Sequence, residues 1–299
     1  MTSQWLKRFA KDPKPSTQGL PLVVTLDGFL NAGNTGNLAA GVLKQNEIGV
    51  VHEFDADFLI DHRSRRPMIR FATDHFHGYR PHRLDITKHR DLEGNEYLLL
   101  SGPEPDYHWE MFIDELHEFI DENNVPLVLT LGGVPMGVPH TRPILLTAHG
   151  NRPELVDRPS LWDSEIQIPA SLSSVLEYRL GGYGHDAAGY VAHVPHYLTG
   201  VDFPTAALEL LEATGMRLNL LFNVENLLIA EADTNAQIES QIDEQGGLDV
   251  LKGLEEQYDA YQRGAGRSLL ADEEHIPSGE ELADQFEQFL AQQTGDEQS

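Results

Sequence analysis

Short apolar runs alternate with stretches of helical periodicity between residue 20 and about residue 216. Residues 22–26 are apolar and rich in β-branched side chains, which predicts a strand. The loop after them is crowded with Gly and Asn, and the Ala- and Leu-rich residues that follow predict a helix. Because ligands of open α/β sheets bind beyond the carboxyl ends of strands, this loop is the first candidate site.

The same alternation continues along the chain. Residues 83–87 and 97–101 predict a β-hairpin closed by a turn at 91–95. A helix is expected after Asp106, its predicted N-cap, because apolar residues recur there at the spacing of one buried helical face. Further strands are predicted at 49–54, 126–135, 142–147 and 187–194, and further helices at 169–180 and 202–215.

Strands and helices in this order predict an α/β domain with a mostly parallel sheet. The predicted organisation is a polar lead at 1–19, the α/β domain at 20–216 and an acidic helical extension at 217–299. Apolar residues at helical spacing predict helices in the extension around 224–242, 251–261 and 282–290. These helices are expected either to pack on the domain or to lie in a subunit interface.

Composition narrows the class of protein. The absence of Cys removes disulfides and thiolate chemistry and fits a reducing, cytoplasmic location. The formal net charge of −27 argues against nucleic acid and against anionic membranes as partners, because both require a basic face. Residues 231–299 hold 18 Asp and Glu against 3 Lys and Arg. A solvated helical appendage is favoured there over an acidic interaction arm.

Residues 61–67, Asp-His-Arg-Ser-Arg-Arg-Pro, form a dense basic cluster. The cluster could bind an anion, but salt bridges within this acidic protein are the favoured interpretation. Among the His residues, His75-x-His77 and His193-x-x-His196 are the closest pairs, and no known spacing of three metal ligands occurs. No Ser lies in a Gly-x-Ser-x-Gly elbow. We therefore assign no catalytic residue and expect neither a metal nor a cofactor.

Glycine and polar residues near two strand ends form the candidate ligand site. The loop glycines match neither the dinucleotide spacing nor a phosphate loop, so they either shape a tight turn, which is favoured, or bind a ligand. Asp27 either caps this turn through backbone amides, which is favoured, or serves as a base or ribose ligand; Asn34 either caps the helix or holds the ligand. His140 and Arg142 could join Asp27 and Asn34 around one cleft. The candidates are Asp27, Gly28, Asn31, Gly33, Asn34, Gly36, Asn37, Gly132, Gly133, His140, Arg142 and His196.

Three segments together resemble the PAC2 family, which is named after a proteasome assembly chaperone. They are Gly-Phe-Leu-Asn-Ala-Gly-Asn-Thr-Gly at 28–36, Gly-Gly-Val-Pro at 132–135, and Gly-Tyr-Val-Ala-His-Val-Pro-His-Tyr at 189–197 with the helix start at 204–211 behind it. The His-Val-Pro-His-Tyr piece and the acidic end are similar to the long actinobacterial branch. The resemblance covers about residues 20–216.

The resemblance implies a three-layer α/β/α core similar to purine nucleoside phosphorylases, followed here by the C-terminal helical segment. It also implies an assembly-chaperone or binding role for some relatives, without assigned catalytic residues. The phosphorylase likeness concerns the fold and does not transfer activity. Residues 295–299 lack the hydrophobic–Tyr–x ending that docks on proteasome rings, so direct docking of that kind is not expected.

Two hypotheses of function result. The first is a non-enzymatic binding or assembly-chaperone-like protein that acts as a homo-oligomer, such as a trimer, with a protein partner. The second is a binding protein for a small, nucleoside-like molecule, or a hydrolase or phosphorylase-type enzyme, that uses the Gly-rich loops at the sheet edge. The lack of a catalytic signature favours the first.

Overall fold

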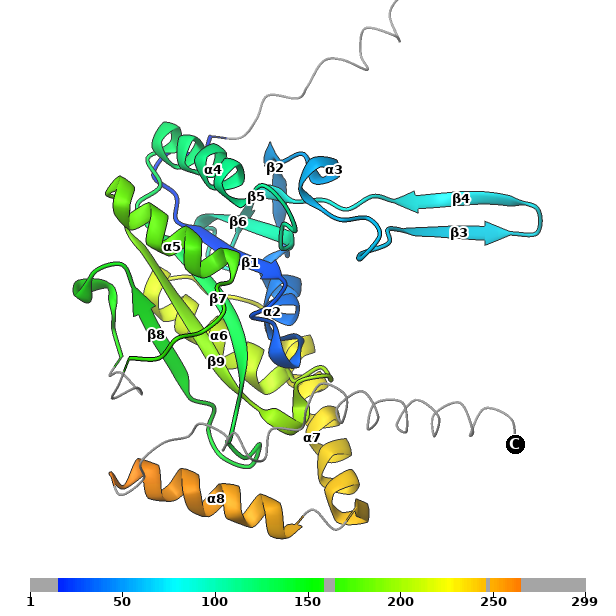
Figure 1. Ribbon diagram of the computed structural model, residues 1–299, viewed down its shortest axis with the longest axis vertical. Coiled ribbons are helices and arrows are strands. Elements are labelled where there is room, and N and C mark those ends of the chain that lie inside the picture. Colours follow the sequence, from blue (N-terminus) through cyan, green and yellow to red (C-terminus); the bar gives the residue numbers. More distant parts are fainter. Residues whose placement is uncertain (1–15, 159–164, 246–247, 265–299) are drawn as a thin grey trace, which may run out of the picture.

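A seven-stranded sheet with the order β2-β5-β6-β1-β7-β9-β8 forms the centre of the molecule (Figure 1). The computed structural model describes residues 16–158, 165–245 and 248–264. β5 and β8 run against the other five strands, which confirms the predicted mostly parallel sheet. The strands are β1 (Leu22–Asp27), β2 (Glu47–Glu53), β5 (Asp85–Arg90), β6 (Glu96–Pro103), β7 (Val128–Met136), β8 (Leu146–Gly150) and β9 (Ala187–Pro195).

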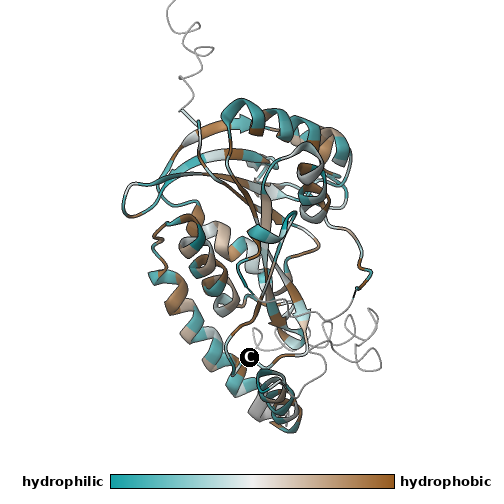
Figure 2. Cartoon of the chain, turned by 90° about the vertical axis from the view of Figure 1, so that its left-hand side faces the viewer, coloured by the Kyte–Doolittle hydropathy of each residue, from teal (hydrophilic) through white to brown (hydrophobic). Residues whose placement is uncertain are grey.

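Helices cover both faces of this sheet. α2 (Thr35–Leu43) and α6 (Pro204–Leu218) pack on one face, and α4 (Trp109–Asn123) and α5 (Leu172–Tyr183) on the other. Side chains of β1 alternate between the two cores, as strand geometry requires. Figure 2 shows hydrophobic residues concentrated along the central strands and hydrophilic ones on the outer sides of the helices. The three-layer α/β/α core is therefore confirmed. Short elements complete the fold: η1 (Ala32–Asn34), α3 (Ala56–Leu59), η2 (Pro153–Leu155) and η3 (His196–Leu198).

The start of α4 differs from the prediction. The N-cap is His108, in the left-handed region at φ 58°, and not Asp106. Asp106 is engaged elsewhere, because its carboxylate accepts a hydrogen bond from the backbone N–H of Asp61 at 2.7 Å. The Asp106 carboxylate therefore joins the segment before α4 to the segment after α3.

The predicted ends of two helices, at residues 180 and 215, each before or at a glycine, were also wrong. α5 continues through Gly181 and Gly182 and ends at Gly184, which has a φ of 89°. α6 continues past Gly215 and ends at Asn219, which has a φ of 53°. The left-handed conformation, which Gly and Asn tolerate best, ends both helices, and it falls a few residues later than the first glycine.

The hairpin of β3 (Met68–Ala72) and β4 (His75–Arg80) was not predicted. It forms a separate two-stranded sheet that extends away from the body of the molecule (Figure 1). None of its residues belongs to a hydrophobic core of the described part of the chain. Its exposed large apolar side chains are Met68, Ile69, Phe71, Phe76 and Tyr79.

Two helices, α7 (Glu225–Gln245) and α8 (Leu248–Gln262), follow the α/β core. α7 lies against α6. In α8, Tyr258 packs with Met136, and its hydroxyl donates to the Pro143 carbonyl at 2.8 Å. This part of the extension therefore packs on the domain, which was one of the two expected arrangements.

The helix predicted at 282–290 and most of the polar lead lie outside the described residues. The domain boundaries at 20 and 216 stay predictions. No helix in the described ranges is long and apolar enough to cross a membrane.

Candidate functional site

Hydrogen bonds between its own side chains hold the loop after β1. Asn31 donates from Nδ2 to Asp27 Oδ1 at 2.8 Å and accepts from the Gly36 N–H at 2.9 Å. Asn37 donates to Asn34 Oδ1 at 2.8 Å. The structure thus brings these predicted site residues together, with contacts that shape the loop.

Asn34 occupies the predicted N-cap position of α2, but its side chain makes no capping hydrogen bond. It adopts a φ of 51° and donates to Asp202 Oδ1 at 2.7 Å. The expected capping role is therefore wrong. Asn34 instead links the loop to the segment that precedes α6.

Glu104 performs the capping that the sequence assigned to Asp27. Its buried carboxylate accepts from the Phe29 N–H at 3.0 Å and from the Leu172 N–H at 2.6 Å. A Cβ on Gly28 would lie 1.9 Å from Glu104 Oε2, so Gly28 leaves room for this carboxylate. The prediction missed Glu104; the one signal for it was an acidic residue three positions after the predicted strand at 97–101.

Glycines allow the loop to lie against β7. An added Cβ on Gly132 or Gly133 would come within 2.9 Å of the carbonyl oxygen of Leu30 or Ala32, respectively. Gly33 has a φ of 63°, and an added Cβ there would lie 3.0 Å from two core side chains. These glycines therefore have a packing role, and a role in ligand binding stays a prediction.

His140 and Tyr197 connect the loops that follow β7 and β9. The Tyr197 hydroxyl accepts from the His140 N–H at 2.9 Å and lies 2.8 Å from His140 Nδ1. Burial raises the pKa of Tyr197 to about 12. Burial also lowers the pKa of His140, against the opposing effect of Glu239 and Glu255. His140 Nε2 is buried and has no hydrogen-bond partner among the described residues.

His196 lies at the start of η3, next to the end of β9. Burial lowers its pKa, and a hydrogen bond with the backbone of Met136 opposes this effect. The His196 ring contacts the Tyr197 ring edge to face, with the centroids 5.4 Å apart. His196 and His140 therefore both touch Tyr197.

Arg142 is held by α8 and not by the loop after β1. Its guanidinium makes two hydrogen bonds to the carboxylate of Asp259, at 2.9 and 3.0 Å, and one to Glu255 at 3.1 Å. The Arg142 hydrogen bonds lower the pKa of Asp259. The contacts of Arg142 therefore place it apart from Asp27 and Asn34, with which it was expected to share a cleft.

The basic cluster lies beside the loop after β1. Arg65 donates from Nη1 to the Asp27 carbonyl at 2.7 Å and lies 4.0 Å from the Asp106 carboxylate. His62 lies 3.5 Å from Asp57. Pairing within the protein is thus confirmed for these two members of the cluster.

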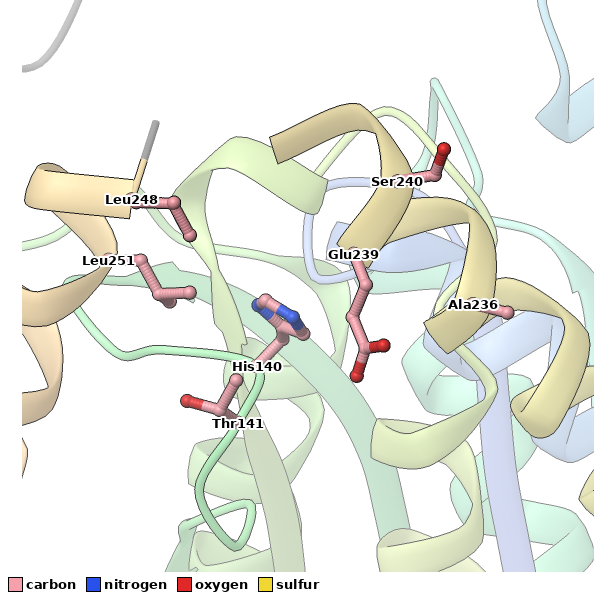
Figure 3. A pocket seen from close by; sticks show the side chains of 7 residues that line it. All are labelled: His140, Thr141, Ala236, Glu239, Ser240, Leu248 and Leu251. Atoms are coloured by element: carbon pink, nitrogen blue, oxygen red, sulfur yellow. The ribbon is translucent and has the colours of Figure 1, made fainter. Parts of the chain in front are cut away.

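A cavity of 460 Å³ lies where α7, α8 and the loop after β7 meet (Figure 3). Of the predicted site residues, His140 lines it, whereas the residues of 27–37 do not. In Figure 3 the His140 ring lies between Leu251 of α8 and Glu239 of α7. The cavity therefore combines an imidazole and a carboxylate with apolar walls. Its other lining residues are Thr141, Ala236, Ser240 and Leu248.

The order of these elements also matches a known family. A model of the PAC2 family matches residues 25–245, from within β1 to the end of α7. The chain belongs to the PAC2 family. A search of curated proteins found no match.

Solved PAC2-like structures cover most of this chain. Rv2714 from Mycobacterium tuberculosis, a protein of unknown function, is 41% identical with a TM-score of 0.79, over 85% of this chain and 91% of that one. A protein of unknown function from Corynebacterium glutamicum is 30% identical with a TM-score of 0.79, over 85% of this chain and 98% of that one. Rv2125, a proteasome-assembly chaperone homologue from Mycobacterium tuberculosis, is 25% identical with a TM-score of 0.69, over 75% of this chain and 95% of that one.

Proposed function

We propose that this PAC2 protein is a non-enzymatic, assembly-chaperone-like binding protein that acts as a homo-oligomer in the cytoplasm. The observation that carries the proposal is the exposed β3–β4 hairpin. The likeness to a proteasome-assembly chaperone homologue supports a role in binding other proteins. The α/β domain at 20–216 supplies the scaffold, and the acidic extension at 217–299 follows it.

The hairpin presents apolar side chains for which the described part of the chain offers no core. Phe71 is 62% exposed and Phe76 67% exposed, and their ring centroids lie 5.0 Å apart across the two strands. Clustered exposed apolar side chains mark interaction sites on soluble proteins. Burial of this pair against another chain would remove apolar surface from water, which favours association.

Charge identifies a second copy of the chain as a fitting occupant. Residues 62–83 hold six Arg and one Asp, whereas the whole chain has a net charge of −27. The hairpin and its base are therefore basic, and the remainder is strongly acidic. Opposite potentials of this kind steer association and favour the matching partner.

Capture from native lysate tests the binding role. The wild-type protein should retain a second protein in a fixed ratio. The Phe71→Ser/Phe76→Ser variant tests whether the homo-oligomer formed through the hairpin is needed for this retention, and Tyr178→Ser, which removes an aromatic side chain 76% exposed on α5, is the matched control. Recovery of this protein alone at every salt concentration would contradict an assembly role.

The cavity lined by His140 favours a second candidate function, the binding of a small nucleoside-like molecule. The buried Nε2 atom of His140 has no hydrogen-bond partner among the described residues and lies in a cavity with Glu239, which suits a polar ligand group. A thermal-shift screen with nucleosides, nucleotides and sugar phosphates should then raise the Tm of the wild type but not of His140→Gln. No shift with any of these compounds would rule this candidate out.

A further inference from the structure

His117, Asp121 and His185 bring three possible metal ligands together, away from the loops described above. His117 and Asp121 lie one turn apart on α4, and His185 lies in the turn between α5 and β9. His185 Nε2 is 3.0 Å from His117 Nδ1 and 3.4 Å from Asp121 Oδ1. One donor atom from each residue lies within 4.8 Å of the other two.

The helix and a neighbouring ring hold this arrangement. Residues four apart on a helix share a face, which puts His117 and Asp121 side by side. The Tyr183 ring stacks on His117, with the centroids 4.1 Å apart and an interplanar angle of 8°. The Tyr183 hydroxyl donates to Asp114 at 2.8 Å, which fixes the stacking ring in turn. The His117 imidazole is therefore positioned before any ion binds.

The donor set and spacing suit a transition metal. Zn²⁺ binds imidazole nitrogens and carboxylate oxygens at about 2.0–2.2 Å, so ligands around a tetrahedral ion stand about 3.3 Å apart. The distances from His185 to the other two residues bracket this value. Two imidazoles favour Zn²⁺, Ni²⁺ or Cu²⁺ over Mg²⁺ and Ca²⁺, which prefer all-oxygen sites.

We propose that His117, Asp121 and His185 bind one divalent first-row transition metal ion, of the Zn²⁺ type, per chain. Water completes the coordination, because the Asp121 side chain is 64% exposed and the His117 side chain 25%. The ion clamps α4 to the α5–β9 turn, at a place where the sequence predicted no metal. The site is independent of the proposed role in protein binding.

Metal titration of the full-length protein, stripped with a chelator, tests the site. Calorimetry with Zn²⁺ should give one ion per chain, and Co²⁺ should give the visible absorption of a low-coordinate ion. Loss of groups that only orient a metal ligand already costs about 10- to 100-fold in affinity, so His185→Gln should weaken Zn²⁺ binding by about 100-fold or more. The variant His75→Gln/His77→Gln removes another close pair of imidazoles, with centroids 5.7 Å apart, and should bind as the wild type does.

If His117 and His185 share only a hydrogen bond and bind no metal ion, the titrations give different results. In that case wild type and His185→Gln bind Zn²⁺ equally weakly, and the proposal fails. Asp121→His separates the two further, because a third imidazole should tighten Zn²⁺ binding only if the three residues share an ion. If His185→Gln does not fold, Asp121→Asn at the exposed ligand replaces it, with weaker Zn²⁺ binding expected and unchanged binding overturning the proposal.

Discussion

Asp91 joins the β5–β6 turn to the segment that precedes α7. Its carboxylate accepts from the N–H groups of Glu93, Asn95 and Leu221 and from the Asn95 side-chain amide, at 2.7–3.0 Å. Burial would raise the pKa of Asp91, but these hydrogen bonds outweigh it and lower the pKa. The ionised form therefore stabilises the folded state.

Replacing Asp91 should be costly. Asp91→Ala is expected to lower the free energy of unfolding by about 2 kcal/mol, because several partly buried donors lose a charged acceptor. Glu93→Ala in the same turn, at an exposed position, is the control and should change it by less than about 0.5 kcal/mol. Urea unfolding measures both, and equal effects would contradict the role of Asp91.

The pH dependence of stability follows from the same carboxylate. Because its folded-state pKa is lowered, the Asp91 contribution is present above the unfolded pKa and is lost as the pH falls through the folded value. Wild-type stability should therefore fall more steeply than that of Asp91→Asn below about pH 4. Parallel curves for the two proteins would contradict this assignment.

Single residues show what the sequence could and could not predict. The turn at 91–95 followed from local composition, because Asp and Gly favour turns by themselves. The contact of Asp91 with Leu221, like those of Glu104 with Phe29 and Leu172, joins residues far apart in the chain. Such pairings depend on the folded packing, and no local pattern encodes them.

Among the elements, η1 and α2 depend on Gly33, whose φ of 63° lies in the left-handed region. Gly33→Ala should destabilise the protein by about 1–3 kcal/mol, because it places a Cβ in a left-handed conformation and against core side chains. Gly41→Ala in α2 meets no atom within 4 Å and should be neutral or stabilising by up to about 1 kcal/mol. Thermal unfolding compares the two, and equal Tm values would refute the packing role of Gly33.

The pairing of α8 with the loop before β8 rests on Arg142. Arg142→Ala removes the hydrogen bonds to Asp259 and Glu255, so amide exchange in α8 should accelerate while β1 and β7 stay protected. Lys252→Ala, at an exposed position of the same helix, should leave exchange unchanged. Unaltered protection of α8 in Arg142→Ala would mean that Tyr258 and its neighbours hold the helix alone.

Elements that face a core were predictable. The central strands are apolar runs buried on both faces, and α4 carries apolar residues at helical spacing on its one buried face. Among the described residues the β3–β4 hairpin buries no such face, so its apolar residues followed no buried pattern. α4, α5 and α6 each end at a residue in the left-handed conformation. Packing decides which residue adopts it, so the sequence alone did not predict these ends.

At the scale of the whole molecule, the candidate loop at 27–37 and the cavity at His140 are distinct places. The loop is held by hydrogen bonds between Asn31 and Asp27 and between Asn37 and Asn34, and it packs through glycines. The cavity is built largely by α7 and α8. The sequence predicted that the loops after β1 and β7 lie at the same edge of the sheet. It did not predict that the cavity lies apart from the loop at 27–37, because the extension helices supply cavity side chains more than 90 positions after His140.

The β3–β4 hairpin is the feature that connects the molecule to its proposed assembly. Its apolar side chains are exposed, and its charge opposes that of the remaining chain. In a homo-oligomer both properties become favourable contacts. The proposal therefore depends on the state of the protein in solution.

Light scattering coupled to size-exclusion chromatography measures this state directly. We predict that the wild type and Tyr178→Ser have a mass of at least two times 33.4 kDa, in a whole-number multiple, and that the mass of Phe71→Ser/Phe76→Ser shifts toward 33.4 kDa. A wild-type mass of 33.4 kDa at all concentrations, or an unchanged multiple in the hairpin variant, would contradict a homo-oligomer held by this hairpin.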